Sequence, residues 1–510
     1  MSTEHITGEP EQADEVAVRA KAAEVLNIWP SAGVAVAIVR NGRPPRFHSH
    51  GVADTSTGEP VTEDTVFRVG SLTKTVTAVA IMQLWEQGLI DLDAPANRYL
   101  TTFRLRPVRP DLPPATVRHL LTHTSGVGYW RRLPDLLRPG FGAGISAPRL
   151  VPLGDYYRRG LPQEIEPGTK WAYSNHGFAA LGQIVEDVTG QALGDYFRAH
   201  IFDPLGMDHT DLVRSVRVLP GLATGYVIRR RGLVPVDDFE VPAPGGGGLY
   251  STAADMARYT ACLLPGGAAG QGAILQPSTA ELMFQPHFQP DPRLPGVALG
   301  FNIGAEGEHR IVGKDGILSG FLAHLALAQS EGVGVVVLTN TGAISGQGAA
   351  TPLGTALLRL LLRLPHEALR TDLPPHAEVW SALCGWYAPA PGPVTNLFNR
   401  LLMGAGVEVA VHRNQLMMKP LTPVPAMRKG MRLYPDNPDD PYTFRIDMTE
   451  LGQGTIPVVF TSPTGAGTSQ LLMDTLAFQK RPDAQNPRRL AAGALAAGAA
   501  VLTLRRGLRH

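Results

Sequence analysis

The chain has 510 residues, of which 44% are hydrophobic, so it exceeds the size that one core usually serves and we expect two domains. Its formal net charge is +1 and its basic residues are scattered, which argues against a nucleic-acid-binding surface or an acidic partner. The two cysteines, Cys262 and Cys384, lie far apart without C-x-x-C spacing, so neither a disulfide framework nor a zinc site is expected.

The two ends of the chain differ in character. Residues 1–15 are polar and acidic and are expected to be disordered, and no apolar run near them would act as a signal peptide, so a cytoplasmic location is expected. The run LAAGALAAGAAVLTL, from Leu490 to Leu504, has fifteen residues without charge between two basic pairs. It is shorter than the roughly 17–25 apolar residues of a spanning helix. It is therefore a helix packed on the protein, a frayed tail or a short membrane-associating tail.

The predicted elements begin with a helix over residues 15–27 and a hairpin. The β-branched run GVAVAIVR, from Gly33 to Arg40, is followed by the turn NGRPP and the second strand RFHSHGVAD. The stretch VFRVGSLTKTVTAV then opens a mostly buried helix from Ser71 to a C-cap at Gly88. A short helix and turn over residues 116–126 follow a proline-rich, irregular stretch.

A long segment over residues 129–168 has no clear periodicity and is expected to act as a lid or binding loop. Helices are predicted over residues 177–190 and 192–206 and after a cap near residues 251–252. Two strands, 321–329 and 333–340, precede a helix that ends at Pro365. We expect the first domain over residues 16–365, a linker over 366–378, a β-rich domain over 379–485 and a tail over 486–510.

Ser71 and Lys74 form the first candidate for chemistry. Their spacing of three places both side chains on one helical face, and Gly70 allows the tight entry that exposes the serine at the helix N-terminus. A desolvated lysine beside a serine accepts its hydroxyl proton. Other motifs do not fit, because Thr73 stands where a P-loop needs glycine, and Val69 and Thr73 occupy the glycine positions of G-x-S-x-G.

Two further short motifs follow along the chain. Tyr173-Ser174-Asn175 precedes a helix and offers a phenol and an amide on the same side of a turn. In IVGKDGILSGF, Lys314-Asp315-Gly316 lies just before the strand predicted from residue 321, where a glycine would let the backbone approach a substrate closely. Taken alone, the first is an ordinary helix cap and the second a surface turn between strands.

Together, S-x-x-K, Y-x-N and K-x-G occur in an order that resembles the serine β-lactamase and penicillin-binding-protein superfamily, most closely its class C β-lactamase-like esterases and peptidases. The stretches TVRHLLTHTSGV, PGTKWAYSNHGFAALGQIVEDVTG and GGGLYSTAADMARY are similar to that family as well. The resemblance covers about residues 20–365. It implies an α/β (α+β) fold of the β-lactamase/transpeptidase type, with an antiparallel sheet flanked by helices. The short β-prone segments after residue 379 predict in addition a small C-terminal all-β domain, lipocalin-like or another β-barrel.

The resemblance also implies the roles of the residues. Ser71 is the nucleophile that forms an acyl-enzyme, and Lys74 and Tyr173 share the general base and acid work, with the choice of base left open. Asn175, Lys314, Asp315 and Gly316 bind substrate. The backbone N–H groups of Ser71 and Ile317 form the oxyanion hole. No cofactor or metal is expected, and the partner is a small ester, amide or peptide.

Asp315 departs from the family pattern, in which Lys-Thr-Gly or Lys-Ser-Gly meets a substrate carboxylate. A carboxylate at this position repels such a group unless Lys314 neutralises it, which favours an esterase or amidase acting on uncharged acyl groups. A β-lactamase and a D-amino-acid peptidase are the alternatives within the family. A non-catalytic scaffold with the same fold is the alternative of another class, and the retention of Ser71, Lys74 and Tyr173 argues against it.

Four histidines and two aromatic residues are further candidates for a functional site. His119 and His123 lie four apart on a predicted helix but have no recognisable third metal ligand. His48 and His50 alternate along a strand and are expected at the surface. Tyr129 and Trp130, at the start of the long loop, either line an acyl pocket or pack away from solvent.

Overall fold

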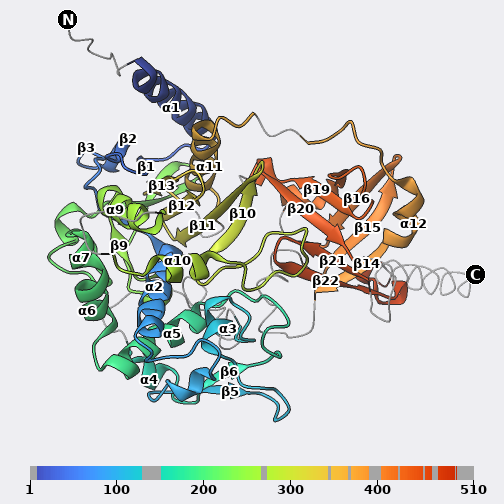
Figure 1. The fold of residues 1–510 in the computed structure, drawn as a ribbon. Helices are drawn as coiled ribbons and strands as arrows, with labels where there is room; N and C mark the ends of the chain where they lie inside the picture. The colour runs from blue at the N-terminus through green and yellow to red at the C-terminus, as the bar shows by residue number, and fades with distance from the viewer. Residues whose placement is uncertain are drawn as a thin grey trace, which may run out of the picture. The chain divides into compact units, whose positions relative to one another are not determined.

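A computed structural model describes residues 9–128, 151–265, 273–342, 346–365, 369–389, 404–422, 425–451, 454–461, 469–488 and 490. The chain divides into two compact units (Figure 1). Unit 1 comprises Met1–Gln289 and Pro295–His366, and unit 2 comprises Pro290–Leu294 and Glu367–His510. The short segment Pro290–Leu294 thus groups with unit 2, although the sequence places it in the first domain.

A seven-stranded antiparallel sheet forms the centre of unit 1. Its strands follow the order β10-β11-β12-β13-β1-β2-β3. The predicted hairpin is present as β1 (Gly33–Arg40) and β2 (Arg46–Asp54), and β1 pairs on its other side with β13 (Val333–Thr339). The remaining strands are β3 (Glu59–Pro60), β10 (Asn302–Glu306), β11 (His309–Leu318) and β12 (Phe321–Ala328). Strands β12 and β13 are buried along their whole length, as expected for apolar runs covered on both faces.

Helices cover both faces of this sheet (Figure 1). On one face, α1 (Glu9–Ile28) and α11 (Ala350–Leu361) pack together over Val34, Val36 and Ile38. On the other face, α2 (Thr73–Glu86), α5 (Asn175–Thr189) and α9 (Ala253–Leu263) belong to the larger core. Every residue of α2 from Thr73 to Leu84 is buried, which explains a helix with so apolar a sequence. Helix α2, which carries Lys74, is therefore enclosed by the core of unit 1.

Shorter elements complete unit 1. They are β4 (Phe67–Arg68), β5 (Leu105–Pro107), α3 (Val117–Leu121), α4 (Leu153–Tyr156), β6 (Leu161–Gln163), α6 (Leu193–Phe197), α7 (Asp203–Leu205), β7 (Gly225–Arg229), β8 (Gly232–Val236), α8 (Pro244–Gly247), β9 (Tyr250–Ser251) and α10 (Pro277–Phe284).

Three sequence predictions differ from the structure of unit 1. The first helix begins at Glu9, not at residue 15, because the start Glu9-Pro10-Glu11 combines a proline suited to the first turn with acidic residues that favour a helix N-terminus. The Lys314 motif lies inside strand β11 and not in a turn, because pairing with β12 outweighs the low strand propensity of its residues. The segment predicted as one loop contains α4 and β6 within its described part, residues 151–168.

Unit 2 contains a nine-stranded antiparallel sheet that nearly closes into a barrel. Its strand order is β17-β16-β15-β14-β22-β21-β20-β19-β18. Strands that are neighbours in the sequence are neighbours around the barrel, and β14, the first of them in the chain, pairs with β22, the last. The opening lies between β17 and β18, and it is narrow because β17 also contacts β19. This is the up-and-down order that lipocalin barrels use. The interior is filled by a cluster that includes Tyr387, Met418 and Phe460, and Trp386 is buried as well.

The strands and helices of unit 2 have the following bounds. They are α12 (Trp380–Leu383), β14 (Gly385–Pro389), β15 (Val407–His412), β16 (Gln415–Pro420), α14 (Pro425–Arg428), β17 (Met431–Arg432), β18 (Tyr434–Pro435), β19 (Thr443–Asp447), β20 (Thr455–Phe460), β21 (Gln470–Met473) and β22 (Leu476–Arg481).

The predicted tail begins inside unit 2. Asn486 is buried, and both Asn486 and Arg488 donate hydrogen bonds to Glu408 of β15. The apolar run after Leu490 lies outside the described residues. Within the described part of the chain, no helix is long and apolar enough to cross a bilayer.

Candidate active site

Ser71 lies in a 3₁₀ turn, Gly70–Leu72, that joins β4 to α2. Gly70 has a φ of +51°, and a Cβ there would lie 2.9 Å from the backbone nitrogen of Ile317 on β11. Glycine is therefore required twice, for its backbone conformation and for the close approach of the two segments. This turn presents Ser71 directly beside the strand that carries the third motif.

Lys74, in the first turn of α2, is fully buried and surrounded by oxygen atoms. Its Nζ lies 3.0 Å from Ser71 Oγ and 2.7 Å from Asn175 Oδ1, and it also contacts the carbonyl oxygen of Gly246 closely. The aromatic rings of Tyr173 and Phe178 flank the amine, with Nζ 4.9 Å and 5.7 Å from their centroids. The predicted pairing of Ser71 with Lys74 is thus present at hydrogen-bonding distance.

Tyr173 reaches Ser71 from the segment that leads into α5. Its hydroxyl lies 2.6 Å from Ser71 Oγ. Ser174 caps the helix by accepting a hydrogen bond from Gly177 N at 3.0 Å and anchors the segment by donating to Gly128 O at 2.9 Å. Because Asn175 is the first helical residue, the cap fixes the phenol and the amide on either side of it.

Lys314 and Gly316 lie on the face of β11 that meets Tyr173 and Val69. The Nζ of Lys314 lies 5.4 Å from the centroid of the Tyr173 ring. A Cβ on Gly316 would lie 2.0 Å from the carbonyl oxygen of Val69, so this glycine allows the strand to approach the segment that leads to Ser71. The sequence predicts that Gly316 lets the backbone approach a substrate. In the structure, the group that comes close to this glycine is the carbonyl of Val69.

Asp315 points the other way. Adjacent strand residues project from opposite faces, and Asp315 Oδ1 accepts hydrogen bonds from His324 at 2.7 Å and Thr351 at 2.9 Å, on the α11 side of the sheet. The hydrogen-bond partners of Asp315 are therefore His324 and Thr351, and Lys314 acts on it only through its charge. The Asp315 side chain is nevertheless 42% exposed, so the carboxylate remains accessible at this strand.

Burial controls the charges at this site. It drives the pKa of Lys74 well below its ordinary value, and the nearby positive charge of Lys314 lowers it further. Burial also lowers the pKa of Lys314 to about 8, although Asp315 opposes the shift. Burial would raise the pKa of Asp315, but hydrogen bonds from His324 and Thr351 outweigh it and the pKa is lowered. The Lys74 ammonium thus loses its proton more readily than an ordinary lysine does, and the Asp315 carboxyl ionises more readily than an ordinary aspartic acid.

Two contributors to the site were missed in the sequence. The carbonyl oxygen of Gly246 accepts from Lys74, and only the glycine run at 245–248 gave a signal that the backbone passes close to other elements there. The ring of His123 stacks on Tyr173 with centroids 4.4 Å apart, and its Nδ1 accepts from Ser174 N at 3.2 Å. Burial drives the pKa of His123 well below its ordinary value, so the ring is neutral.

Arg68, three residues before Ser71, is a further residue that the sequence analysis missed. It is buried, donates to Asp238 and to the carbonyl oxygen of Phe239, and lies 4.2 Å from the centroid of the Tyr250 ring. Asp238 also accepts from Tyr250. These contacts hold the strand leading to Ser71 against a segment 170 residues further along the chain.

The other histidine candidates do not assemble a metal site. His119 bonds with Thr116 in a helix cap, while His123 is engaged at Ser174. Within the described residues, no group of three or more histidine, cysteine or acidic side chains could hold a metal ion. Tyr129 and Trp130 lie outside the described residues.

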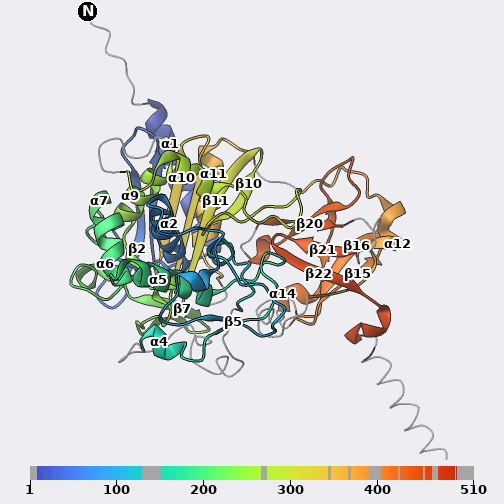
Figure 2. The same cartoon turned by 60° about the horizontal axis from the view of Figure 1, so that its bottom comes forward.

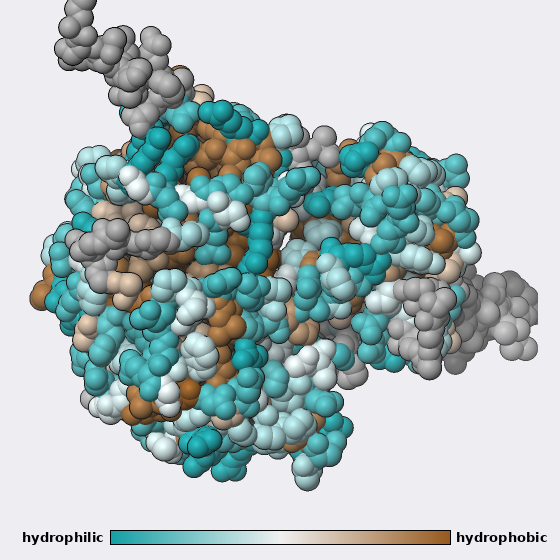
Figure 3. Space-filling view, in the orientation of Figure 1, coloured by the Kyte–Doolittle hydropathy of each residue, from teal (hydrophilic) through white to brown (hydrophobic). Residues whose placement is uncertain are grey.

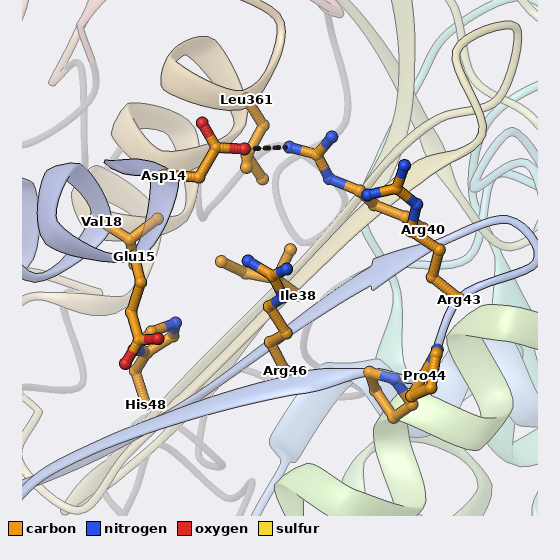
Figure 4. A pocket seen from close by; sticks show the side chains of 11 residues that line it. Asp14, Glu15, Val18, Ile38, Arg40, Arg43, Pro44, Arg46, His48 and Leu361 are labelled. Atoms are coloured by element: carbon orange, nitrogen blue, oxygen red, sulfur yellow. Dashed lines mark hydrogen bonds and ion pairs between the residues drawn. The ribbon is translucent and has the colours of Figure 1, made fainter. Parts of the chain in front are cut away.

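A separate cavity of about 400 Å³ lies between α1, the β1–β2 hairpin and α11 (Figure 4). Its lining consists of Asp14, Glu15, Val18, Ile38, Arg40, Arg43, Pro44, Pro45, Arg46, His48 and Leu361. An ion pair of 3.5 Å joins Asp14 to Arg40 across it (Figure 4). Ile38 belongs to the core under α1 and α11, on the opposite face of the sheet from α2. The cavity therefore contains no residue of the Ser71 site.

A family model described as Beta-lactamase matches residues 29–356, which is more than half of the chain and includes every residue of the site. The chain belongs to the Beta-lactamase family. The match ends before unit 2 apart from the segment Pro290–Leu294.

Individual relatives of this Beta-lactamase family member carry different activities in their names. Esterase EstB from Burkholderia gladioli is 37% identical over 248 residues, which cover 46% of this chain and 61% of the esterase. A beta-lactamase from Yersinia enterocolitica is 30% identical over 230 residues, which cover 44% of this chain and 53% of that protein. The chain thus aligns with a little over half the length of these relatives.

Structural similarity to a solved protein covers more of the chain than these sequence alignments do. The octameric penicillin-binding protein homologue from Pyrococcus abyssi superposes with a TM-score of 0.60 and 23% identity, over 92% of this chain and all of that one. At this identity the likeness concerns the fold alone.

Proposed function

We propose that this Beta-lactamase family member is a serine hydrolase that forms an acyl-enzyme on Ser71 and hydrolyses esters of small, uncharged acyl groups. The observation that carries the proposal is the position of Ser71 Oγ, 2.6 Å from the Tyr173 hydroxyl and 3.0 Å from Lys74 Nζ. A serine with a base and an acid at hydrogen-bonding distance is the arrangement that nucleophilic catalysis needs.

The contacts of Lys74 favour it as the base. A neutral amine has two N–H groups and one lone pair, and Lys74 faces two oxygens that only accept, Asn175 Oδ1 and Gly246 O. These use both N–H groups and leave the lone pair for Ser71. Ser71 then donates its proton to Lys74, while the Tyr173 hydroxyl donates to Ser71 Oγ.

The reaction follows from this arrangement. Ser71 Oγ attacks the ester carbonyl as its proton moves to Lys74, and Tyr173 gives its proton to the departing alkoxide. Water then attacks the acyl-enzyme and loses a proton to the Tyr173 phenolate, while Lys74 returns its proton to Ser71. Lys314, when protonated, stabilises the phenolate through its position over the ring.

The backbone N–H groups of Ser71 and Ile317 serve as the oxyanion hole in this proposal. The closeness of Gly70 to Ile317 N supports it, since the two segments meet next to the nucleophile. Loss of one such donor typically costs about 10²–10³ in rate.

Preference for uncharged esters is supported by Asp315 and by the esterase relative. Asp315 stands where the family pattern has a threonine or serine, and its own side chain turns to His324 and Thr351, so residue 315 offers no hydroxyl to a substrate carboxylate. Esterase EstB is also more similar to this chain than the beta-lactamase from Yersinia enterocolitica, at 37% against 30% identity.

The test compares wild type with Ser71→Ala on p-nitrophenyl butyrate and on a chromogenic cephalosporin. Ester turnover that disappears in the variant, with little cephalosporin cleavage, is the expected result. Dominant cephalosporin turnover would favour a β-lactamase, and Ser71-dependent release of D-alanine from a short peptide without ester turnover would favour a peptidase. If a fluorophosphonate fails to label Ser71, the chain is a binding scaffold.

A further inference from the structure

The hairpin formed by β7 and β8 carries exposed apolar and basic side chains close together. Its strands pair from Gly225 with Val236 to Arg229 with Gly232. All residues from 228 to 235 are exposed. Figure 2 shows β7 in the lower part of unit 1.

Three consecutive arginines lie at the tip of this hairpin, Arg229 at the end of β7 and Arg230 and Arg231 in the turn. Arg229, Arg230 and Arg231 make no ion pair with any other described residue, and no acidic residue occurs between residues 225 and 236. Asp238, which follows the hairpin, is already bound by Arg68 and Arg214. The turn therefore presents three positive charges that the described protein does not neutralise.

Aliphatic side chains flank these charges on both faces of the hairpin. Ile228 is 56% exposed, and Leu233 and Val234 are each 41% exposed. Ile228 pairs directly with Leu233 and projects from one face, while Val234, paired with Val227, projects from the other. By contrast, hydrophilic residues cover most of the face of unit 1 seen in Figure 3.

The base of the hairpin is fixed to the rest of unit 1. Tyr226 N donates to Asn340 O at 2.8 Å, and the Tyr226 hydroxyl accepts from Thr55 N at 2.8 Å. A Cβ on Gly225 would lie 2.5 Å from the Phe321 ring, and one on Gly320 would lie 3.0 Å from Gly225. The hairpin thus rises beside the turn from β11 to β12, and β11 is the strand that borders Ser71.

We propose that the β7–β8 hairpin docks the protein on an anionic lipid surface. The arginines lie among the headgroups, and Ile228, Leu233 and Val234 reach the boundary with the acyl chains. The charge favours an anionic partner. A lipid surface fits better than an acidic protein, because a flat protein face would cover only one side of the ribbon, whereas a bilayer boundary surrounds its tip. Docking there brings the end of β11 towards the lipid.

The test measures co-sedimentation of the full chain with vesicles of phosphatidylcholine containing phosphatidylserine, and with vesicles of phosphatidylcholine alone. Wild type is expected to bind the anionic vesicles, and 0.5 M salt should weaken binding by screening. Each arginine near such a surface contributes about five-fold in affinity. R229Q/R230Q/R231Q should therefore bind about a hundred-fold more weakly.

Two further variants sharpen the result. I228S/L233S/V234S should weaken binding while its salt dependence remains. R19Q/R43Q/R363Q removes the same charge from α1, the β1–β2 turn and the end of α11, and should bind like wild type. Turnover of a soluble ester, which does not involve the hairpin tip, checks that each variant is folded.

Three results would overturn the proposal. They are absence of wild-type binding to anionic vesicles, equal losses in the hairpin and control arginine variants, and full binding by both hairpin variants. If both hairpin variants bind fully, a variant that lacks residues 489–510 is measured as well. Loss of binding in that variant alone would identify the C-terminal tail as the membrane anchor.

Discussion

Asn175→Asp places a negative charge beside the amine that we propose as the base. The replaced oxygen lies 2.7 Å from Lys74 Nζ, so the attraction between carboxylate and ammonium is about 6 kcal/mol at an effective dielectric constant of 20. That interaction raises the pKa of Lys74 and keeps the amine protonated at neutral pH. Ser71 then loses its proton acceptor, and the rate should fall by about 10²–10⁴, the usual contribution of a general base.

The assay is kcat/KM for p-nitrophenyl butyrate across pH 5–10. In Asn175→Asp the acidic limb of the profile should move to higher pH, so activity partly returns under alkaline conditions. Asn175→Ala is the matched control, because it removes the same oxygen without adding charge and should not move that limb upward. An unchanged acidic limb in Asn175→Asp would refute Lys74 as the base and favour the Tyr173 phenolate.

Three other predictions follow from the same geometry. Burial lowers the pKa of Lys314 to about 8, so this lysine loses its charge as the pH rises through that value. The kcat of the wild type should therefore decline above pH 8. In the same pH–rate profile, Lys314→Arg should show no such decline, because arginine stays charged. Gly316→Ala sets a Cβ against the Val69 carbonyl and should destabilise the fold by about 3 kcal/mol in urea unfolding, whereas Gly304→Ala, with open space around it, should have little effect. Asp315→Thr restores the hydroxyl residue of the family pattern and should raise cephalosporin turnover relative to ester turnover in paired assays, and an unaltered ratio would remove residue 315 as the basis of selectivity.

The sequence was most informative where spacing along a helix defines geometry. The three-residue interval between Ser71 and Lys74 predicted that their side chains meet, as they do although Ser71 lies in the 3₁₀ turn that precedes α2, and the cap at Ser174 fixed the entry to α5. That Tyr173 would meet Ser71 followed only from the family resemblance, because the two residues are 102 apart in the chain and no local rule relates them.

Errors occurred where tertiary pairing overrides local preference. Lys314, Asp315 and Gly316 have turn-like propensities, yet pairing with β12 makes them strand, and that strand's alternation turns Asp315 away from Lys314. The contribution of Gly246 could not be predicted either. The group that contacts Lys74 is the backbone carbonyl of Gly246, and every residue has such a carbonyl. The glycine side chain matters only because its small size lets this backbone come close to Lys74.

The environment of Lys74 also determines when activity can arise during folding. Its contacts with Asn175 and Gly246 span 101 and 172 residues, and the Tyr173 contact of Ser71 spans 102. Closing loops of this length is slow compared with forming local helices. Helix α2 can therefore form long before its lysine has lost water and charge. Refolding chains should regain far-ultraviolet circular dichroism first and ester turnover later, so that hydrolysis reports the completed core of unit 1.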